Sequence, residues 1–79
     1  MTILDLNEGE KAVIASFDIQ KIPLKLIEMG CMPGHPIELI QKAPFGDPYY
    51  LKINETHVAI RKELAADIII TLETDKYER

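Results

Sequence analysis

Residues 21–34 have the sequence KIPLKLIEMGCMPG, which combines the features of one short helix with two turns. The apolar residues recur at intervals of four and three, the spacing of one helix face: Ile22, Leu26 and Met29. Pro23 suits the first turn of a helix, and Gly30 suits the position just after the last turn. The spacing predicts a helix over residues 21–29, which needs a sheet to pack against because it is so short.

On both sides of this stretch, glycine, proline and asparagine divide the chain into short segments with strand composition. Val, Ile, Tyr and Phe are frequent in these segments, and such residues suit a pleated, half-buried surface. The predicted strands are residues 11–17, 37–42, 49–53, 57–60 and 68–72. Residues 3–6 form a further short apolar segment, which leaves room for a sixth strand.

The connections between these segments carry recognisable turn chemistry. Asn7 to Glu10 contains a glycine that tolerates positive φ, and residues 54–56 return the chain as a hairpin. Residues 61–67 are expected to form a single tight turn, because the segment Glu63-Leu64-Ala65-Ala66 is too short to form a stable helix alone.

The C-terminal part of the chain combines a dense apolar run with a charged tail. The dense apolar run from Ile68 to Ile70 predicts burial on both faces of its strand. The charged tail, residues 73–79, is expected to fray.

Together these segments predict a mostly β protein, a small barrel of five to six strands with one short α-helix. A barrel is favoured because a small open sheet would leave an edge exposed to aggregation. A domain of this size cannot enclose a deep cavity, so any site should lie on its surface.

Composition restricts the classes of function. The chain has 79 residues, 47% hydrophobic and 28% charged, as expected for one domain over residues 1–79. Its formal charge of −4 argues against nucleic-acid binding, which depends on phosphate contacts. No apolar run is long enough to span a membrane, so no direct membrane insertion is expected. The single cysteine excludes an intramolecular disulfide, and with no leader visible we expect a cytoplasmic protein.

Catalytic patterns are weak in this sequence. Cys31 is the only thiol, and it follows a predicted helix C-terminus, where the helix dipole disfavours a thiolate. The chain contains no glycine-rich phosphate loop of the G-x-x-x-x-G-K type. We therefore expect that the protein is not an enzyme and requires no cofactor.

Metal binding is a more open question. Cys31, His35 and His57 are candidate ligands, and a mixed Cys and His site would favour Zn²⁺ over Fe²⁺. Neither a Cys-x-x-Cys nor a His-x-x-x-His pair is present, so weak surface binding is favoured over a dedicated site. The alternative roles are an apolar filler for the cysteine and ordinary surface positions for the two histidines.

A rigid loop beside an aromatic pair is the candidate recognition element. Two prolines bracket the loop, which costs little ordering entropy on binding: Pro44, Phe45, Gly46, Asp47 and Pro48. Tyr49 and Tyr50 follow, and loop aromatics can line a groove for an extended peptide. The alternative is that one tyrosine packs in the core and the other covers the rim of the barrel.

The order of these motifs resembles the ferrous iron transport protein A family, FeoA, over about residues 3 to 72. The motifs that carry the resemblance are the Gly9 turn, Leu26-Ile27-Glu28-Met29-Gly30, Met32-Pro33-Gly34, Pro44-Phe45-Gly46-Asp47-Pro48 and Val58-Ala59-Ile60-Arg61-Lys62. The resemblance implies an SH3-like barrel. It also implies a small cytoplasmic accessory of FeoB, a large membrane GTPase that imports ferrous iron.

The resemblance therefore suggests a protein that binds the cytoplasmic part of a FeoB-type transporter and modulates its assembly or activity. Candidate contact residues lie in the predicted helix and in the rigid loop: Lys21, Lys25, Pro44, Phe45, Gly46, Asp47 and Tyr49. The alternative is a divalent-metal sensor or chaperone that uses Cys31, His35 or His57. The sequence leaves the oligomeric state open.

Overall fold

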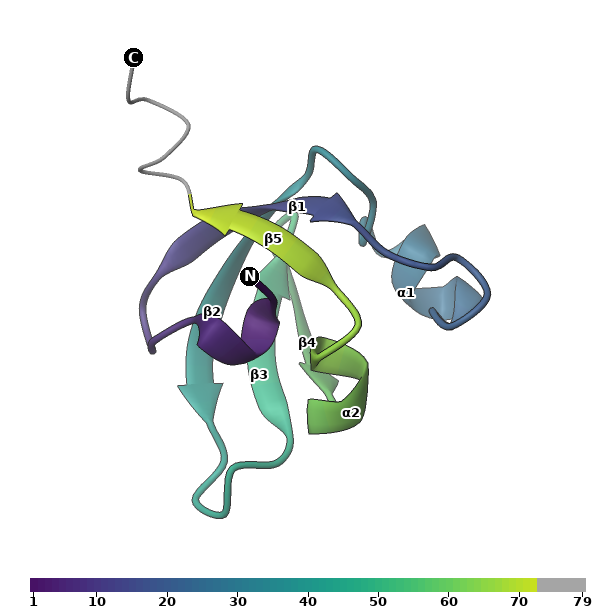
Figure 1. The fold of residues 1–79 in the computed structure, drawn as a ribbon. Helices are drawn as coiled ribbons and strands as arrows, with labels where there is room; N and C mark the ends of the chain where they lie inside the picture. Colours follow the sequence, from purple (N-terminus) through teal and green to yellow (C-terminus); the bar gives the residue numbers. More distant parts are fainter. Residues whose placement is uncertain (73–79) are drawn as a thin grey trace.

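The computed structural model describes residues 1–72 of the chain, which fold into one strongly curved antiparallel sheet (Figure 1). Its five strands are β1 (Lys11–Ser16), β2 (Pro36–Lys42), β3 (Tyr49–Ile53), β4 (Thr56–Ile60) and β5 (Ile69–Leu72). They are ordered β4-β3-β2-β1-β5. The predicted five-stranded, mostly β barrel is confirmed. The sheet is not closed, because the outer strands β4 and β5 do not pair with each other within the described residues.

The core lies inside this curved sheet and follows the alternation of the strands. Tyr49, Leu51 and Ile53 point inward from β3, and Ile37 and Leu39 point inward from β2. Across residues 1–72, every fully buried side chain is apolar or aromatic. The core therefore holds no charged group that could perform chemistry in the interior.

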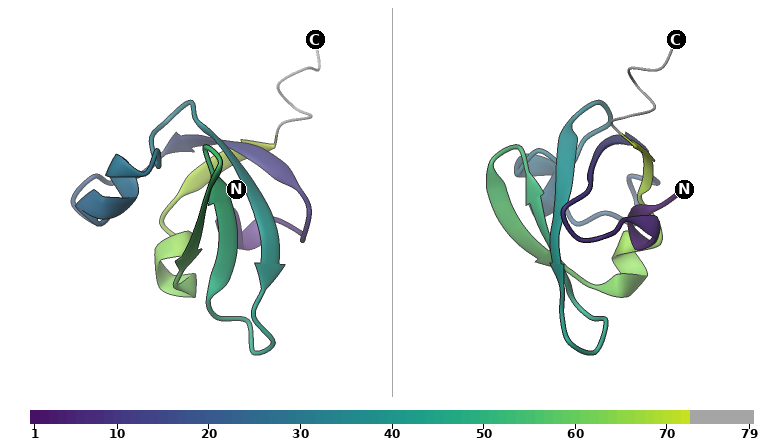
Figure 2. Two further views of the ribbon diagram at one scale, coloured as in Figure 1. Left: turned by 180° about the vertical axis from the view of Figure 1, so that it is seen from behind. Right: turned by 90° about the vertical axis from the view of Figure 1, so that its left-hand side faces the viewer.

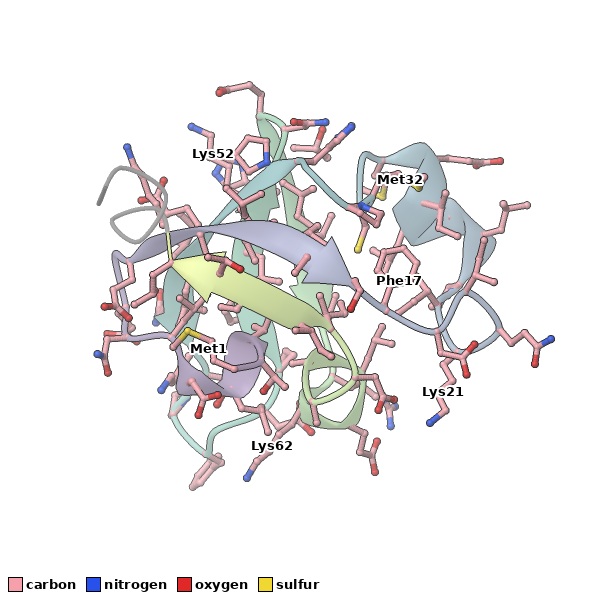
Figure 3. All side chains as sticks on the ribbon, turned by 45° about the horizontal axis from the view of Figure 1, so that its top comes forward. Met1, Phe17, Lys21, Met32, Lys52 and Lys62 are labelled. Carbon is pink, nitrogen blue, oxygen red and sulfur yellow. The ribbon has the colours of Figure 1, made fainter. Side chains whose placement is uncertain are left out.

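Three short helical segments surround the sheet: the 3₁₀ turn η1 (Ile3–Asp5), α1 (Leu24–Glu28) and α2 (Lys62–Ala65). Two predictions are wrong here, because the segment expected as a sixth strand is η1 and the segment expected as a turn contains α2. The predicted helix over residues 21–29 is also shorter, since Pro23 is extended and residues 18–21 form a separate turn. Phe17, just after β1, lies beneath α1 (Figure 3) and packs against the core.

The predicted helix stop at Gly30 is confirmed. The Gly30 N–H donates to the Ile27 carbonyl (3.0 Å), and the Cys31 N–H donates to the Leu26 carbonyl (2.9 Å). These two bonds form a Schellman motif, which requires a left-handed residue, and Gly30 has φ +106°. The motif turns the chain inward and buries Cys31 directly after the helix.

We expect Gly30→Ala to destabilise the protein more than Gly34→Ala. Both glycines have positive φ, so both variants incur a cost of about 1–2 kcal/mol. A Cβ on Gly30 would also lie 2.6 Å from Asn54 Nδ2, whereas a Cβ on Gly34 meets no atom within 4 Å. Displacing the Asn54 amide should cost about 1 kcal/mol more. Urea unfolding of both variants measures this difference, and equal losses would contradict it.

The last strand corrects a further expectation. Ile70 is 3% exposed but Ile69 is 45% exposed, so β5 is not buried on both faces. Residues 1–3 run along its outer edge, where the Ile3 N–H donates to the Ile68 carbonyl and the Ile70 N–H donates to the Met1 carbonyl. One face of β5 thus remains open to solvent while its edge is covered.

The predicted hairpin turn between β3 and β4 is confirmed. Asn54 and Glu55 both have positive φ, 48° and 71°, as a two-residue turn of type I′ requires. No helix within residues 1–72 has the length and apolar character needed to cross a membrane. The tail expected to fray, residues 73–79, lies outside the described residues.

Candidate functional site

A surface groove of about 700 Å³ lies between α1, β4 and α2. Both helices stand on the same side of β4 (Figure 2, left). Leu26 of α1 and Met29, the residue just after α1, line the groove together with Val58 of β4 and Leu64 of α2. We call this concave surface the β4 groove.

The β4 groove has a different charge balance from the rest of the chain. The whole chain has nine Lys and Arg against thirteen Asp and Glu. The groove has three cationic side chains, Lys21, Lys25 and Arg61, against two carboxylates, Glu63 and Asp67. Lys21 projects from the segment just before α1 (Figure 3). The groove is thus a locally cationic surface on an acidic protein.

The loop between β2 and β3 presents one large apolar side chain to solvent. Phe45 is 99% exposed at its tip. The loop is held by the Gly46 N–H, which donates to the Ala43 carbonyl (2.7 Å). Asp47 Oδ1 accepts a hydrogen bond from the Lys62 N–H (2.9 Å), the first residue of α2. Asp47 therefore satisfies an otherwise unpaired helix N–H and ties the loop to α2.

The two tyrosines after this loop have opposite environments. Tyr49, a predicted contact residue, is only 5% exposed and belongs to the core, so its ring is not available to a partner. Tyr50 is 42% exposed on the outer face of the sheet. The alternation with Leu51 and Ile53 places Tyr49 inside, and that signal could have distinguished the two.

The three candidate metal ligands are not brought together. Cys31 is buried, and burial raises the pKa of its thiol. Asn54 Nδ2 donates a hydrogen bond to His35 Nδ1 (2.6 Å), which occupies one imidazole nitrogen. His57 is exposed on β4. No three His, Cys, Asp or Glu side chains within residues 1–72 are grouped to hold an ion, so these residues do not fit a dedicated metal site.

The remaining predicted contact residues lie in two separate places. Lys21 and Lys25 border the β4 groove, whereas Pro44 and Phe45 belong to the loop that Asp47 fastens to α2. Sequence reasoning missed Arg61 and Leu64, which the fold adds to the groove. They come from the segment expected to be a plain turn, and no local pattern places them beside α1.

Comparison with known proteins places this architecture in a family. The FeoA domain family matches residues 1–72. A fusion protein of Fe(2+) transport protein A and the Fe(2+) transporter FeoB from Porphyromonas gingivalis is 36% identical over 73 residues. That match covers 91% of this chain and 9% of the fusion protein, so the chain spans only a small part of its relative's length.

Solved structures show the same fold. The FeoA protein from Chlorobium tepidum aligns with a TM-score of 0.85 and 23% identity, covering 92% of this chain and 70% of its own. The Stenotrophomonas maltophilia FeoA, complexed with zinc and described as a prokaryotic SH3 domain protein, aligns with a TM-score of 0.74 and 25% identity. It covers 89% of this chain and 88% of its own. The SH3-like fold is therefore confirmed, and the chain belongs to the FeoA domain family.

Proposed function

We propose that this protein is an accessory of ferrous iron uptake that binds the cytoplasmic part of a FeoB-type membrane GTPase transporter. In this role it would modulate the assembly or activity of the transporter without catalysing a reaction itself, and it would act in the cytoplasm. The observation that supports the proposal is the fusion protein of P. gingivalis, in which a segment similar to this chain is joined to FeoB.

The fusion supports association for a physical reason. A linked domain stays at high effective concentration near its neighbour, so even a weak contact is populated. Where the two proteins are not fused, the accessory protein must supply a surface that binds the transporter. It can change the transporter's state only by binding one state more tightly than another.

Phe45 and the cationic end of α1 are the proposed contact points on this protein. Phe45 is fully exposed, so a partner that covers its ring gains about 1.5–3 kcal/mol. Lys21 and Lys25 would meet acidic side chains of the partner, which mainly speeds association and sets orientation. Asp47 would act indirectly, by holding the loop that presents Phe45.

We expect Phe45→Ala to weaken binding to the cytoplasmic GTPase portion of the cognate transporter by about 10- to 100-fold. Binding is measured by calorimetry without nucleotide, with GDP and with a non-hydrolysable GTP analogue. Ile69→Ala is the control, because it removes an exposed apolar side chain from β5, on another part of the surface. No binding by the wild-type protein in any nucleotide state, to this portion or to the full-length transporter, would refute the proposal.

Metal sensing is a second candidate because the S. maltophilia relative was solved with zinc. In this chain Cys31, His35 and His57 do not converge, which favours only weak surface binding of Fe²⁺ or Zn²⁺. Anaerobic titration with Fe²⁺ tests it, and a saturable site tighter than high micromolar would favour metal sensing over the accessory role.

A further inference from the structure

Across residues 1–72, the sheet has one free edge, on β4. The opposite edge of the sheet, on β5, is covered by backbone hydrogen bonds from residues 1–3. Within the described residues, β4 pairs only with β3, and no backbone hydrogen bond from another segment reaches its other edge. Proteins usually protect such edges because unpaired N–H and C=O groups are a template for a further strand.

The register of the hairpin identifies which backbone groups of β4 are free. In a two-residue hairpin, the pair that flanks the turn is hydrogen-bonded, and here that pair is Ile53 and Thr56. Bonded and non-bonded pairs then alternate, so Val58 and Ile60 bond to β3. His57 and Ala59 therefore direct both their N–H and C=O groups away from β3, along the wall of the β4 groove.

The side chains around this edge favour one kind of segment. A strand added beside β4 would place alternate side chains next to Val58, where Leu26, Met29 and Leu64 form an apolar lining. Three cations, Lys21, Lys25 and Arg61, border the same groove and outnumber its two carboxylates, so the groove favours acidic side chains. A strand matched to the five residues of β4 would be about 17 Å long.

We propose that the β4 groove binds an extended segment of the transporter's cytoplasmic part, with apolar and acidic side chains, as an added strand beside β4. This inference rests on the proposed function. Recognition would come from backbone hydrogen bonds to His57 and Ala59, from apolar packing against α1 and α2, and from the three cations. Phe45 would provide a separate contact from the loop that Asp47 ties to the first residue of α2.

Ala59→Pro tests the backbone contact. Proline removes the outward N–H of Ala59 but none that β3 uses, and prolines are tolerated on edge strands. We expect at least about a 10-fold loss of affinity for the GTPase portion of the transporter, whereas Ala59→Ser, which keeps the N–H, should bind like wild type. Lys25→Glu combined with Arg61→Glu should also weaken binding and reduce its dependence on salt.

Amide hydrogen exchange by NMR provides a measurement that needs no variant. In the free protein, Val58 and Ile60 should exchange slowly and His57 and Ala59 quickly, because only the first two bond to β3. In the complex, exchange at His57 and Ala59 should slow at least about 10-fold. This alternating pattern is specific to strand addition, since a ligand covering the surface would affect neighbouring amides alike.

The outcomes separate this inference from the proposed function. If the transporter portion binds but His57 and Ala59 stay unprotected and Ala59→Pro binds normally, the groove proposal is wrong and the accessory role stands. If wild-type protein does not bind at all, the proposed function fails and this inference fails with it. Protection of His57 and Ala59 that rises with concentration of the protein alone would identify a second copy as the occupant and overturn the proposal.

Discussion

Cys31 should react with a water-soluble thiol reagent at least about 10³-fold more slowly in the native protein than in denaturant. Its side chain is 1% exposed, and burial raises the pKa of the thiol, so the native state offers almost no accessible thiolate. Reaction then requires opening of the structure, which a domain of ordinary stability populates at about 10⁻³ or less. The rate of absorbance change with a chromogenic disulfide measures both states.

A cysteine at the next position is the matched control. Met32 is partly exposed, so the double variant Cys31→Ala, Met32→Cys should react rapidly in the native state. The result bears on metal binding, because a metal ligand must also be an accessible thiolate. Fast native reaction at Cys31, slowed by Zn²⁺ or Fe²⁺, would contradict our assignment and favour the metal-sensing alternative.

Sequence patterns located the strands and turns because both depend on local chemistry. The helix stop at Gly30 and the first turn position at Asn54 have positive φ, which glycine and asparagine tolerate. The helix α2 was missed because its support is not local. Its first N–H bonds to Asp47, 15 residues earlier in the chain, and no periodicity reports that contact.

The candidate site was predictable only in part, because some of its features depend on contacts between distant segments of the chain. The proline-bracketed loop predicts an exposed Phe45, and the structure confirms that exposure. The β4 groove joins residues from α1, β4 and α2, so its shape depends on how three elements pack. The burial of β5 likewise depends on what covers it, which a run of three isoleucines does not specify.

Replacing the two adjacent isoleucines of β5 with alanine should destabilise the protein to very different extents. We expect Ile70→Ala to destabilise the protein by about 2–5 kcal/mol, because it removes a buried side chain and leaves a cavity. Ile69→Ala should cost less than about 1 kcal/mol, mainly through weaker strand propensity. The two changes are chemically identical and lie on one strand, but Ile70 is buried against β1 neighbours while Ile69 faces solvent.

Thermal unfolding followed by circular dichroism distinguishes the two variants. For a domain of this size, each 1 kcal/mol lowers the Tm by about 4–8 °C, so Ile70→Ala should lose at least about 8 °C. Ile70→Val, which removes one methylene, should fall between wild type and Ile70→Ala and so shows that the loss scales with buried volume. Equal losses for Ile69→Ala and Ile70→Ala would mean that both faces of β5 are buried, as the apolar run first suggested. In that case a further segment or a second copy of the chain must cover Ile69 in solution.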